Sequence, residues 1–152
     1  MEIQPWFVSG FVDGEGSFLV SFSIRKKMKV GIEARPSFAL AQHKRNKEII
    51  IGLQRFFQCG GVRFNNHDQT YKFEVRGLND LMEKIFPHFE QYPLLTSKKT
   101  DFETLRQVCR LMKENRHLSV SGMKQVIELA YRMNNLGARR HAKEDLLRIV
   151  ER

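Results

Sequence analysis

The sequence predicts an α+β (mixed α/β) fold in which four antiparallel strands form one sheet and helices cover one of its faces. Apolar and polar residues alternate over 17–25, over 33–41 and in a hairpin at 62–76, which is the pattern of strands with one buried face. Stretches with helical spacing of apolar residues lie before, between and after these runs. The predicted order is therefore αββαββα with additional C-terminal helices, and a length of 152 residues suits a single domain over 1–152.

The N-terminal part begins with a helix and continues with two strands. The chain is mostly apolar after Pro5, which suits the first turn of a helix, and we place this helix at about 5–15. In the run 17–25 every second residue is apolar. The run 33–41 contains Pro36, which cannot donate to a strand ladder and therefore indicates a sheet edge or a bulge.

A helix and a hairpin come next. Asn46 is a favourable N-cap for a helix that we expect to end at Gly60-Gly61, because glycine closes helices in the left-handed conformation. The hairpin turns at 66–68. Further helices are expected at 79–86, about 100–114, 121–134 and 141–151, so that about 115–152 forms a C-terminal helical extension.

Basic charge is spread along the whole chain. Lys and Arg number 26 against 17 Asp and Glu, which gives a net charge of +9 and a pI near 9.8. Residues 1–76 carry 12 basic and 7 acidic side chains, and residues 77–152 carry 14 and 10, which excludes a basic tail. A basic domain of this size is expected to bind a polyanion, most often nucleic acid.

Several other classes are excluded by composition. No apolar run approaches the roughly 18 residues of a membrane span, and the N-terminus lacks a signal-peptide pattern, so we expect no membrane partner and an intracellular location. Cys59 and Cys109 lack the neighbours of a zinc finger and are expected to be buried thiols. The five histidines are scattered, and we expect them in loops or on the surface.

The end of the first predicted helix carries the most informative pattern. Gly10 and Gly14 stand four residues apart and let a second helix approach closely, which would offset the roughly 1 kcal/mol that each glycine costs. Glu15 follows directly, so a close helix pair would bring two such carboxylates together, and they would need a cation between them. Oxygen ligands of this kind favour Mg²⁺. The alternative is a glycine-rich turn with a solvated Glu15.

The nine residues from Val8 to Gly16, VSGFVDGEG, resemble the LAGLIDADG motif, and with the predicted element order the resemblance covers about 5–105. The family comprises homing endonucleases encoded in mobile introns or inteins, some of which act as RNA maturases. The sequence holds one copy of the motif, and single-motif members work as homodimers. The resemblance therefore implies a dimer interface made by Phe7, Gly10, Phe11 and Gly14.

The resemblance also implies a metal site. Glu15 takes the place of the family's essential acid and would bind Mg²⁺, in a site that Mn²⁺ or Ca²⁺ can also occupy. The carbonyl oxygen of Gly14 is the second expected ligand. Asp13 resembles the position that caps or supports helix ends, and we expect a structural role for it.

Two more catalytic residues follow from the resemblance. Gln42 matches a glutamine that positions solvent near the scissile phosphates, although the arginine that some relatives carry four residues later is Asn46 here. Lys98 best matches a lysine that stabilises charge on the phosphate or lowers the pKa of the attacking water. Lys99 is left open as an alternative to it.

The polar face of the sheet is expected to read the DNA. A β-ribbon fits the major groove and offers side chains to base edges. The alternative is that this face is an ordinary solvent-exposed surface without a binding role. A dimer would contact a long, pseudo-palindromic site. We expect Arg139, Arg140 and Lys143 to contact phosphate or solvent. The candidate DNA-binding residues are Ser21, Ser23, Arg25, Lys27, Glu33, Arg35, Ser37, Arg63, Asn65, Lys72, Glu74 and Arg76.

The sequence thus predicts a homodimeric, Mg²⁺-dependent, site-specific endonuclease that hydrolyses phosphodiester bonds of double-stranded DNA. One alternative is a non-cleaving binder on the same fold, either a DNA-binding regulator or a maturase with intron RNA as its partner. Another is a basic structural protein. The joint presence of Glu15, Gln42 and Lys98 favours cleavage. The compartment, an organelle (chloroplast or mitochondrion) or a prokaryotic cytoplasm, stays open.

Overall fold

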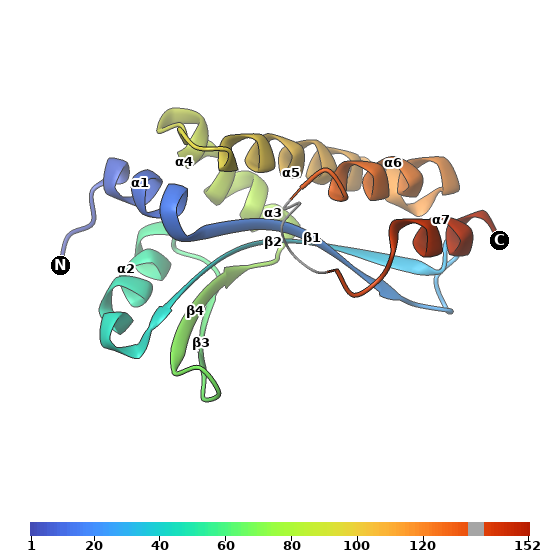
Figure 1. Cartoon of the computed structure of the whole chain (residues 1–152). Coiled ribbons are helices and arrows are strands. Elements are labelled where there is room, and N and C mark those ends of the chain that lie inside the picture. The colour runs from blue at the N-terminus through green and yellow to red at the C-terminus, as the bar shows by residue number, and fades with distance from the viewer. Residues whose placement is uncertain (134–138) are drawn as a thin grey trace. The chain divides into compact units, whose positions relative to one another are not determined.

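The computed structural model describes residues 1–133 and 139–152 and confirms the predicted fold class and element order (Figure 1). The predicted helix over 121–134 is observed as α6, which ends at Ala130, and residue 134 lies outside the described residues. The helices are α1 (Pro5–Glu15), α2 (Lys47–Phe57), α3 (Leu78–Asp80), α4 (Phe86–Gln91), α5 (Lys98–Lys113), α6 (Val120–Ala130) and α7 (Lys143–Glu151), and shorter helical turns are η1 (Lys44–Asn46), η2 (Leu81–Ile85) and η3 (Arg116–Leu118).

Four strands form the predicted antiparallel sheet. They are β1 (Gly16–Ile24), β2 (Ile32–His43), β3 (Gly61–Asn65) and β4 (Thr70–Val75), in the spatial order β1-β2-β4-β3. The β2–β4 register begins with Phe38 opposite Val75, and Gly61 of β3 lies opposite Glu74 of β4. Figure 1 shows β3 and β4 as a hairpin joined by a short turn. This arrangement places β2 and β4 inside the sheet and β1 and β3 at its edges.

The chain divides into two compact units, which are described separately below. The first unit comprises residues 1–17 and 37–99, and the second comprises 18–36 and 100–152. The expectation of one domain over 1–152 stays a prediction.

An aromatic cluster forms the core of the first unit. Phe38 of β2 packs edge-on against Phe57 of α2 and Phe73 of β4, with ring centroids 5.9 and 6.1 Å apart. Phe89 of α4 also meets Phe38, at 5.7 Å. All four side chains are at most 5% exposed. The alternation that buries Phe73 and Val75 leaves Lys72 and Glu74 on the opposite side of β4, whereas β2 is buried on both sides over residues 36–40.

The second unit has its own core. Phe18 of β1 lies 5.7 Å from Phe102 of α5, measured between ring centroids, and α6 packs against α7. Met123 of α6 and Leu146 of α7 are fully buried. The amphipathic helices predicted beyond residue 115 are therefore a packed part of this unit.

Three local expectations need correction. Pro36 lies in an inner strand, but it precedes the segment of β2 that pairs with β4, which begins at Phe38, so its missing N–H removes no bond from the β2–β4 ladder. Asn46 precedes α2 without a side-chain capping bond, because its Nδ2 donates to Gln42 Oε1 at 3.1 Å. The helix α2 ends at Phe57 and not at Gly60, since Gln58 adopts the left-handed conformation (φ 55°) and donates its N–H to a carbonyl four residues back.

His88 is buried, whereas a loop or surface position was expected. It lies on α4 and is 9% exposed, and its Nε2 is 3.1 Å from Ser9 Oγ of α1. Ser9 donates its hydroxyl proton to the carbonyl of Tyr92 at 2.6 Å, so the Nε2 of a neutral His88 donates to Ser9. Burial lowers the pKa of His88 from 6.5 to about 4.

The stability of the protein is expected to decrease in acid because of His88. Its folded pKa lies below the unfolded value, so the contribution is complete above pH 6.5 and is lost as the pH falls to about 4. We expect a loss of about 3 kcal/mol across this window, since each pKa unit corresponds to about 1.4 kcal/mol, measured by urea denaturation at several pH values. His88→Gln should be less stable at neutral pH and lack this slope, whereas His67→Gln in the exposed hairpin turn should retain it. An unchanged slope in His88→Gln would contradict the assignment.

Arg139 is held inside the second unit, so the expectation that it contacts phosphate or solvent is wrong. Its guanidinium donates to the carbonyls of Val20 (2.7 Å) and Ala130 (2.6 Å) and lies 4.5 Å from the centroid of the Tyr131 ring. Burial lowers the pKa of Arg139, and the nearby Tyr131 opposes this shift. Because Val20 is on edge strand β1, the arginine satisfies a carbonyl of that strand and connects it to α6.

Candidate active site and nucleic-acid interface

The C-terminal end of α1 presents the predicted metal ligands to solvent. Gly14 and Glu15 are both exposed, and α1 passes directly into β1 at Gly16. A Cβ atom at Gly16 would lie 2.6 Å from Val12 Cγ1 and 3.0 Å from the Val12 carbonyl oxygen, so this close approach requires glycine. The last carbonyls of a helix lack partners within the helix and carry partial negative charge. Glu15 therefore stands at an end of α1 that favours cations.

Asp13 joins α1 to the segment that precedes α5. Its carboxylate accepts bonds from the Leu95 N–H (2.9 Å), the Thr96 N–H (3.0 Å) and the Thr96 hydroxyl (2.7 Å). Partial burial would raise the pKa of Asp13, but the bonds from Thr96 and Leu95 and the nearby Lys98 outweigh it, so the pKa is lowered. These contacts support the structural role expected for Asp13.

Lys98, at the start of α5, reaches the same end of α1. Its Nζ donates to the Val12 carbonyl oxygen at 3.2 Å, and its backbone N–H donates to Thr96 Oγ1 at 3.3 Å. Lys99 is exposed. The lysine that contacts the motif helix is thus Lys98. Its ammonium binds the carbonyl of Val12, which precedes Glu15 by three residues.

Asp13→Asn is expected to lower the free energy of unfolding by about 1 kcal/mol, the usual cost of losing a capping carboxylate. Because the folded pKa is lowered, the contribution of Asp13 is present above its unfolded pKa and is lost as the pH falls through the folded value. Urea denaturation at neutral pH measures the difference. Asp145→Asn, at an exposed ion pair on α7, serves as the control, and equal midpoints for the two variants would contradict the role of Asp13.

Gln42 lies at the end of β2, opposite Tyr71 in the register with β4. It is half-buried, and its Oε1 accepts the bond from Asn46. In the described part of the chain, no hydrogen bond joins Gln42 to Glu15 or Lys98. Asn46, where some relatives carry arginine, thus bonds the side chain of Gln42, whereas the catalytic role of Gln42 stays a prediction.

One face of α1 is apolar, and the space beside its two glycines is open. Phe7 and Phe11 stack with ring centroids 5.5 Å apart, and Phe7 is 47% exposed. A Cβ atom added at Gly10 or Gly14 would meet nothing within 4 Å. Because i, i+3, i+4 and i+7 share one side of a helix, these four residues make one face that a second helix can approach closely.

The residues at this end of α1 fit a hard divalent cation only in part. Carboxylate and carbonyl oxygens are the ligands that Mg²⁺ prefers. Within residues 1–133 and 139–152, however, no three His, Cys, Asp or Glu side chains gather as a metal site. One chain thus offers Glu15 and Gly14, and a complete set needs a second Glu15 or oxygens from the substrate.

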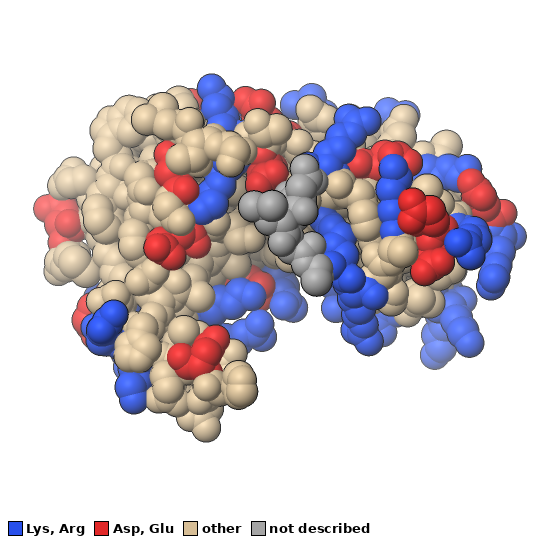
Figure 2. All heavy atoms as spheres, viewed as in Figure 1, with Lys and Arg blue, Asp and Glu red and all other residues tan. Residues whose placement is uncertain are grey.

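Eleven of the twelve candidate DNA-binding residues are exposed or half-buried. Ser37 is 8% exposed, so the free protein does not present it as a reader. Lys27 lies in the turn between β1 and β2 and not on a strand. Figure 2 shows Lys and Arg side chains spread across the visible face among fewer acidic ones.

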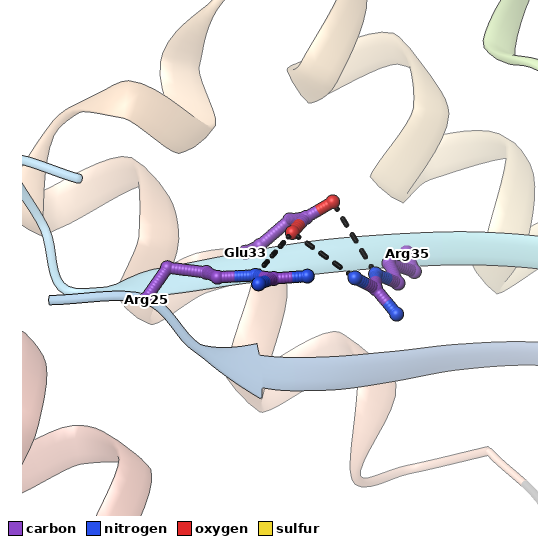
Figure 3. A network of polar contacts seen from close by, with 3 residues as sticks. All are labelled: Arg25, Glu33 and Arg35. Atoms are coloured by element: carbon purple, nitrogen blue, oxygen red, sulfur yellow. Dashed lines mark hydrogen bonds and ion pairs between the residues drawn. The ribbon is translucent and has the colours of Figure 1, made fainter. Parts of the chain in front are cut away.

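Two glutamates on the strands are centres of ion pairs, which the sequence analysis did not recognise. Glu33 accepts from Arg25 (3.0 Å) and Arg35 (3.3 Å) within the second unit (Figure 3). The bonds from Arg35 lower the pKa of Glu33; slight desolvation opposes them and Arg25 adds to them. In the first unit, Glu74 pairs with Lys72 (3.1 Å), Arg76 (3.0 Å) and Arg63 (3.7 Å). Spacing by two along a strand, as in Lys72-Glu74-Arg76, is the signal that predicts such contacts.

None of the described helices combines the length and the hydropathy that crossing a bilayer requires.

A family model described as LAGLIDADG endonuclease matches residues 8–109, more than half of the chain. Among curated proteins, the chain is 32% identical over 127 residues to "Probable intron-encoded endonuclease 2" of Neurospora crassa, which covers 83% of this chain and 28% of that protein. It is 28% identical over 87 residues to "DNA endonuclease I-CeuI" of Chlamydomonas moewusii, covering 57% of this chain and 40% of the relative. The chain thus spans less than half the length of these relatives.

Solved structures match over nearly the whole chain. The homing endonuclease I-TnaI is 38% identical with a TM-score of 0.86, and the match covers 99% of this chain and 98% of that one. The I-LtrWI LAGLIDADG homing endonuclease bound to target DNA is 30% identical with a TM-score of 0.87, over 93% of this chain and 47% of the other. This chain therefore corresponds to about half of the longer protein.

Proposed function

Because the chain belongs to the LAGLIDADG endonuclease family, we propose that it is a site-specific endonuclease that hydrolyses double-stranded DNA as a homodimer. The observation that carries this proposal is the end of α1. There an exposed carboxylate, Glu15, follows a helix face open to a second copy, and Lys98 is bonded to the same helix end. A protein that only binds nucleic acid would not need this acid.

A homodimer follows from the composition of the site. Each chain supplies one Glu15, and two copies that meet through Gly10 and Gly14 would bring two carboxylates close together. Two adjacent carboxylates repel unless a cation lies between them, so the pairing and the ion would support each other. The match to about half of I-LtrWI supports the same conclusion, since two copies of this chain equal the longer protein in size.

We assign Mg²⁺ to the Glu15 carboxylates and the Gly14 carbonyl oxygens. When bound, such an ion supplies charge stabilisation to the phosphate and lowers the pKa of a water. The chain's own groups act around it. Lys98 uses one of its three donors on Val12 and can direct another at an anionic phosphate oxygen. Gln42, oriented by Asn46, can hold the attacking water. The water oxygen bonds to phosphorus and gives up one proton to solvent, the bond from phosphorus to the 3′ oxygen breaks, and solvent returns a proton to that oxygen.

Selection of cleaved sites from a random duplex library tests this function directly. With Mg²⁺ we expect recovery of one long, near-palindromic sequence, because two identical chains read two half-sites. Reactions without a divalent ion should give none. Recovery of bound but uncleaved duplexes in Mg²⁺ would replace the proposal with a DNA-binding regulator, and preferential binding of intron RNA would favour a maturase.

A further inference from the structure

The arginines of the two ion-pair clusters are held in a particular way. In the Glu33 cluster (Arg25, Glu33 and Arg35), Arg25 donates through Nε and Arg35 through Nε and Nη2. Figure 3 shows both guanidinium groups turned toward the one carboxylate. In the Glu74 cluster (Arg63, Lys72, Glu74 and Arg76), Arg76 also contacts the carboxylate through Nε, whereas Arg63 approaches it through Nη2 at 3.7 Å.

The position of the contact decides what the arginines can still bind. A guanidinium has five N–H donors, and Nε is the one nearest the side-chain stem. An arginine held at Nε keeps N–H donors on its two terminal nitrogens. Guanine is recognised by a pair of donors directed at O6 and N7. Arg35 also gives one Nη2 proton to Glu33, but it keeps the second Nη2 proton and both Nη1 protons, so each of these arginines still has a pair of terminal donors for a base.

Fixing these side chains before binding reduces the conformational entropy that is lost when DNA binds. A free arginine side chain loses about 2 kcal/mol of rotamer freedom when it is ordered, and a group ordered before binding avoids part of that loss. Arg35 is the best ordered of the set, since it makes two bonds to Glu33 while its side chain remains 38% exposed. It is both fixed and accessible.

The carboxylates also lower the attraction for any DNA. The Glu33 cluster has a net charge of +1 and the Glu74 cluster +2, one unit less each than their basic residues alone would give. Non-specific affinity comes from phosphate neutralisation and rises with positive charge. The two glutamates therefore weaken the non-specific binding of DNA of any sequence. At the same time they orient the arginines that recognise one particular sequence.

We propose that Glu33 and Glu74 are positioning residues for sequence readout, which orient arginines toward guanine edges and suppress non-specific binding. This inference rests on the proposed function. It differs from the expectation that the two glutamates contact bases themselves, because here they act through Arg35, Arg25 and Arg76.

Glu33→Gln, Glu74→Gln and a matched control test the proposal. Fluorescence anisotropy with Ca²⁺ in place of Mg²⁺ measures Kd for the library-selected duplex and for an unrelated duplex. We expect each variant to bind the unrelated duplex more tightly, with a steeper salt dependence, and to lose about 5- to 50-fold in the ratio between the two duplexes. Glu128→Gln, which removes an ion pair with Lys143 on the helices, adds the same charge and should leave the ratio unchanged.

A double-mutant cycle separates positioning from direct base contact. In a background that carries both Arg25→Gln and Arg35→Gln, Glu33→Gln should cause no further loss of discrimination, because both side chains through which Glu33 acts are gone. A loss of equal size in both backgrounds would overturn the positioning role, and so would an unchanged ratio in all three Glu→Gln variants. If the unmodified protein binds both duplexes equally, the proposed function fails and this inference falls with it.

Discussion

Glu15→Gln is expected to reduce strand cleavage by about 10³-fold while DNA binding in Ca²⁺ changes little. The substitution keeps the size of the side chain but removes the negative charge that would hold the divalent ion, and the loss of one electrostatic contribution to hydrolysis is typically of this size. Single-turnover cleavage of the selected duplex measures the rate. Because Glu15 is exposed, the variant should unfold at the same urea concentration as the unmodified protein.

Glu103→Gln provides the control for this experiment. Glu103 is an exposed glutamate on α5, so its replacement changes the net charge by the same amount without touching the end of α1. We expect its cleavage rate to match that of the unmodified protein. Persistent cleavage by Glu15→Gln would show that the acid of the motif is not the metal ligand.

Gly10→Leu is expected to convert the dimer into a monomer and to abolish double-strand cleavage. Within one chain a side chain at Gly10 meets open space, and replacing a helical glycine adds up to about 1 kcal/mol of helix stability. Between two chains, the same side chain would separate the helices and lose their packing. We therefore expect a monomer of equal or higher stability, measured by sedimentation velocity and by urea denaturation.

This combination of results distinguishes an interface from a structural position. Glu103→Leu places the same leucine on another exposed helix and should remain dimeric and active. Gly10→Ala, a smaller obstacle, should weaken the dimer less than Gly10→Leu. A Gly10→Leu protein that still sediments as a dimer would show that α1 is not the contact between subunits.

Much of the fold can be predicted from periodicity. Strand alternation and helical spacing are properties of neighbouring residues, so β1, β2, the β3–β4 hairpin and the amphipathic helices follow from the sequence itself. The ends of elements are less predictable, because they depend on small differences between competing bonds. Asn46 illustrates this, since its amide bonds Gln42 instead of capping α2.

The buried histidine shows a second limit of the sequence. His88 lies in a polar-looking stretch, Pro-His-Phe-Glu-Gln, and nothing local indicates that it packs against Ser9 of α1. The two residues are 79 positions apart. Similarly, Ser37 belongs to the polar side of an alternating run, but its side chain is only 8% exposed in the folded chain.

The α+β class, the motif and the face of α1 made by Phe7, Gly10, Phe11 and Gly14 can be predicted from the sequence, because they rest on patterns within single helices and strands and on their order along the chain. The folded chain alone reveals that Asp13 holds the segment at Leu95 and Thr96 and that Lys98, not Lys99, reaches the motif helix. These contacts join residues more than 80 positions apart. Chain packing brings such residues together, and local periodicity carries no information about it.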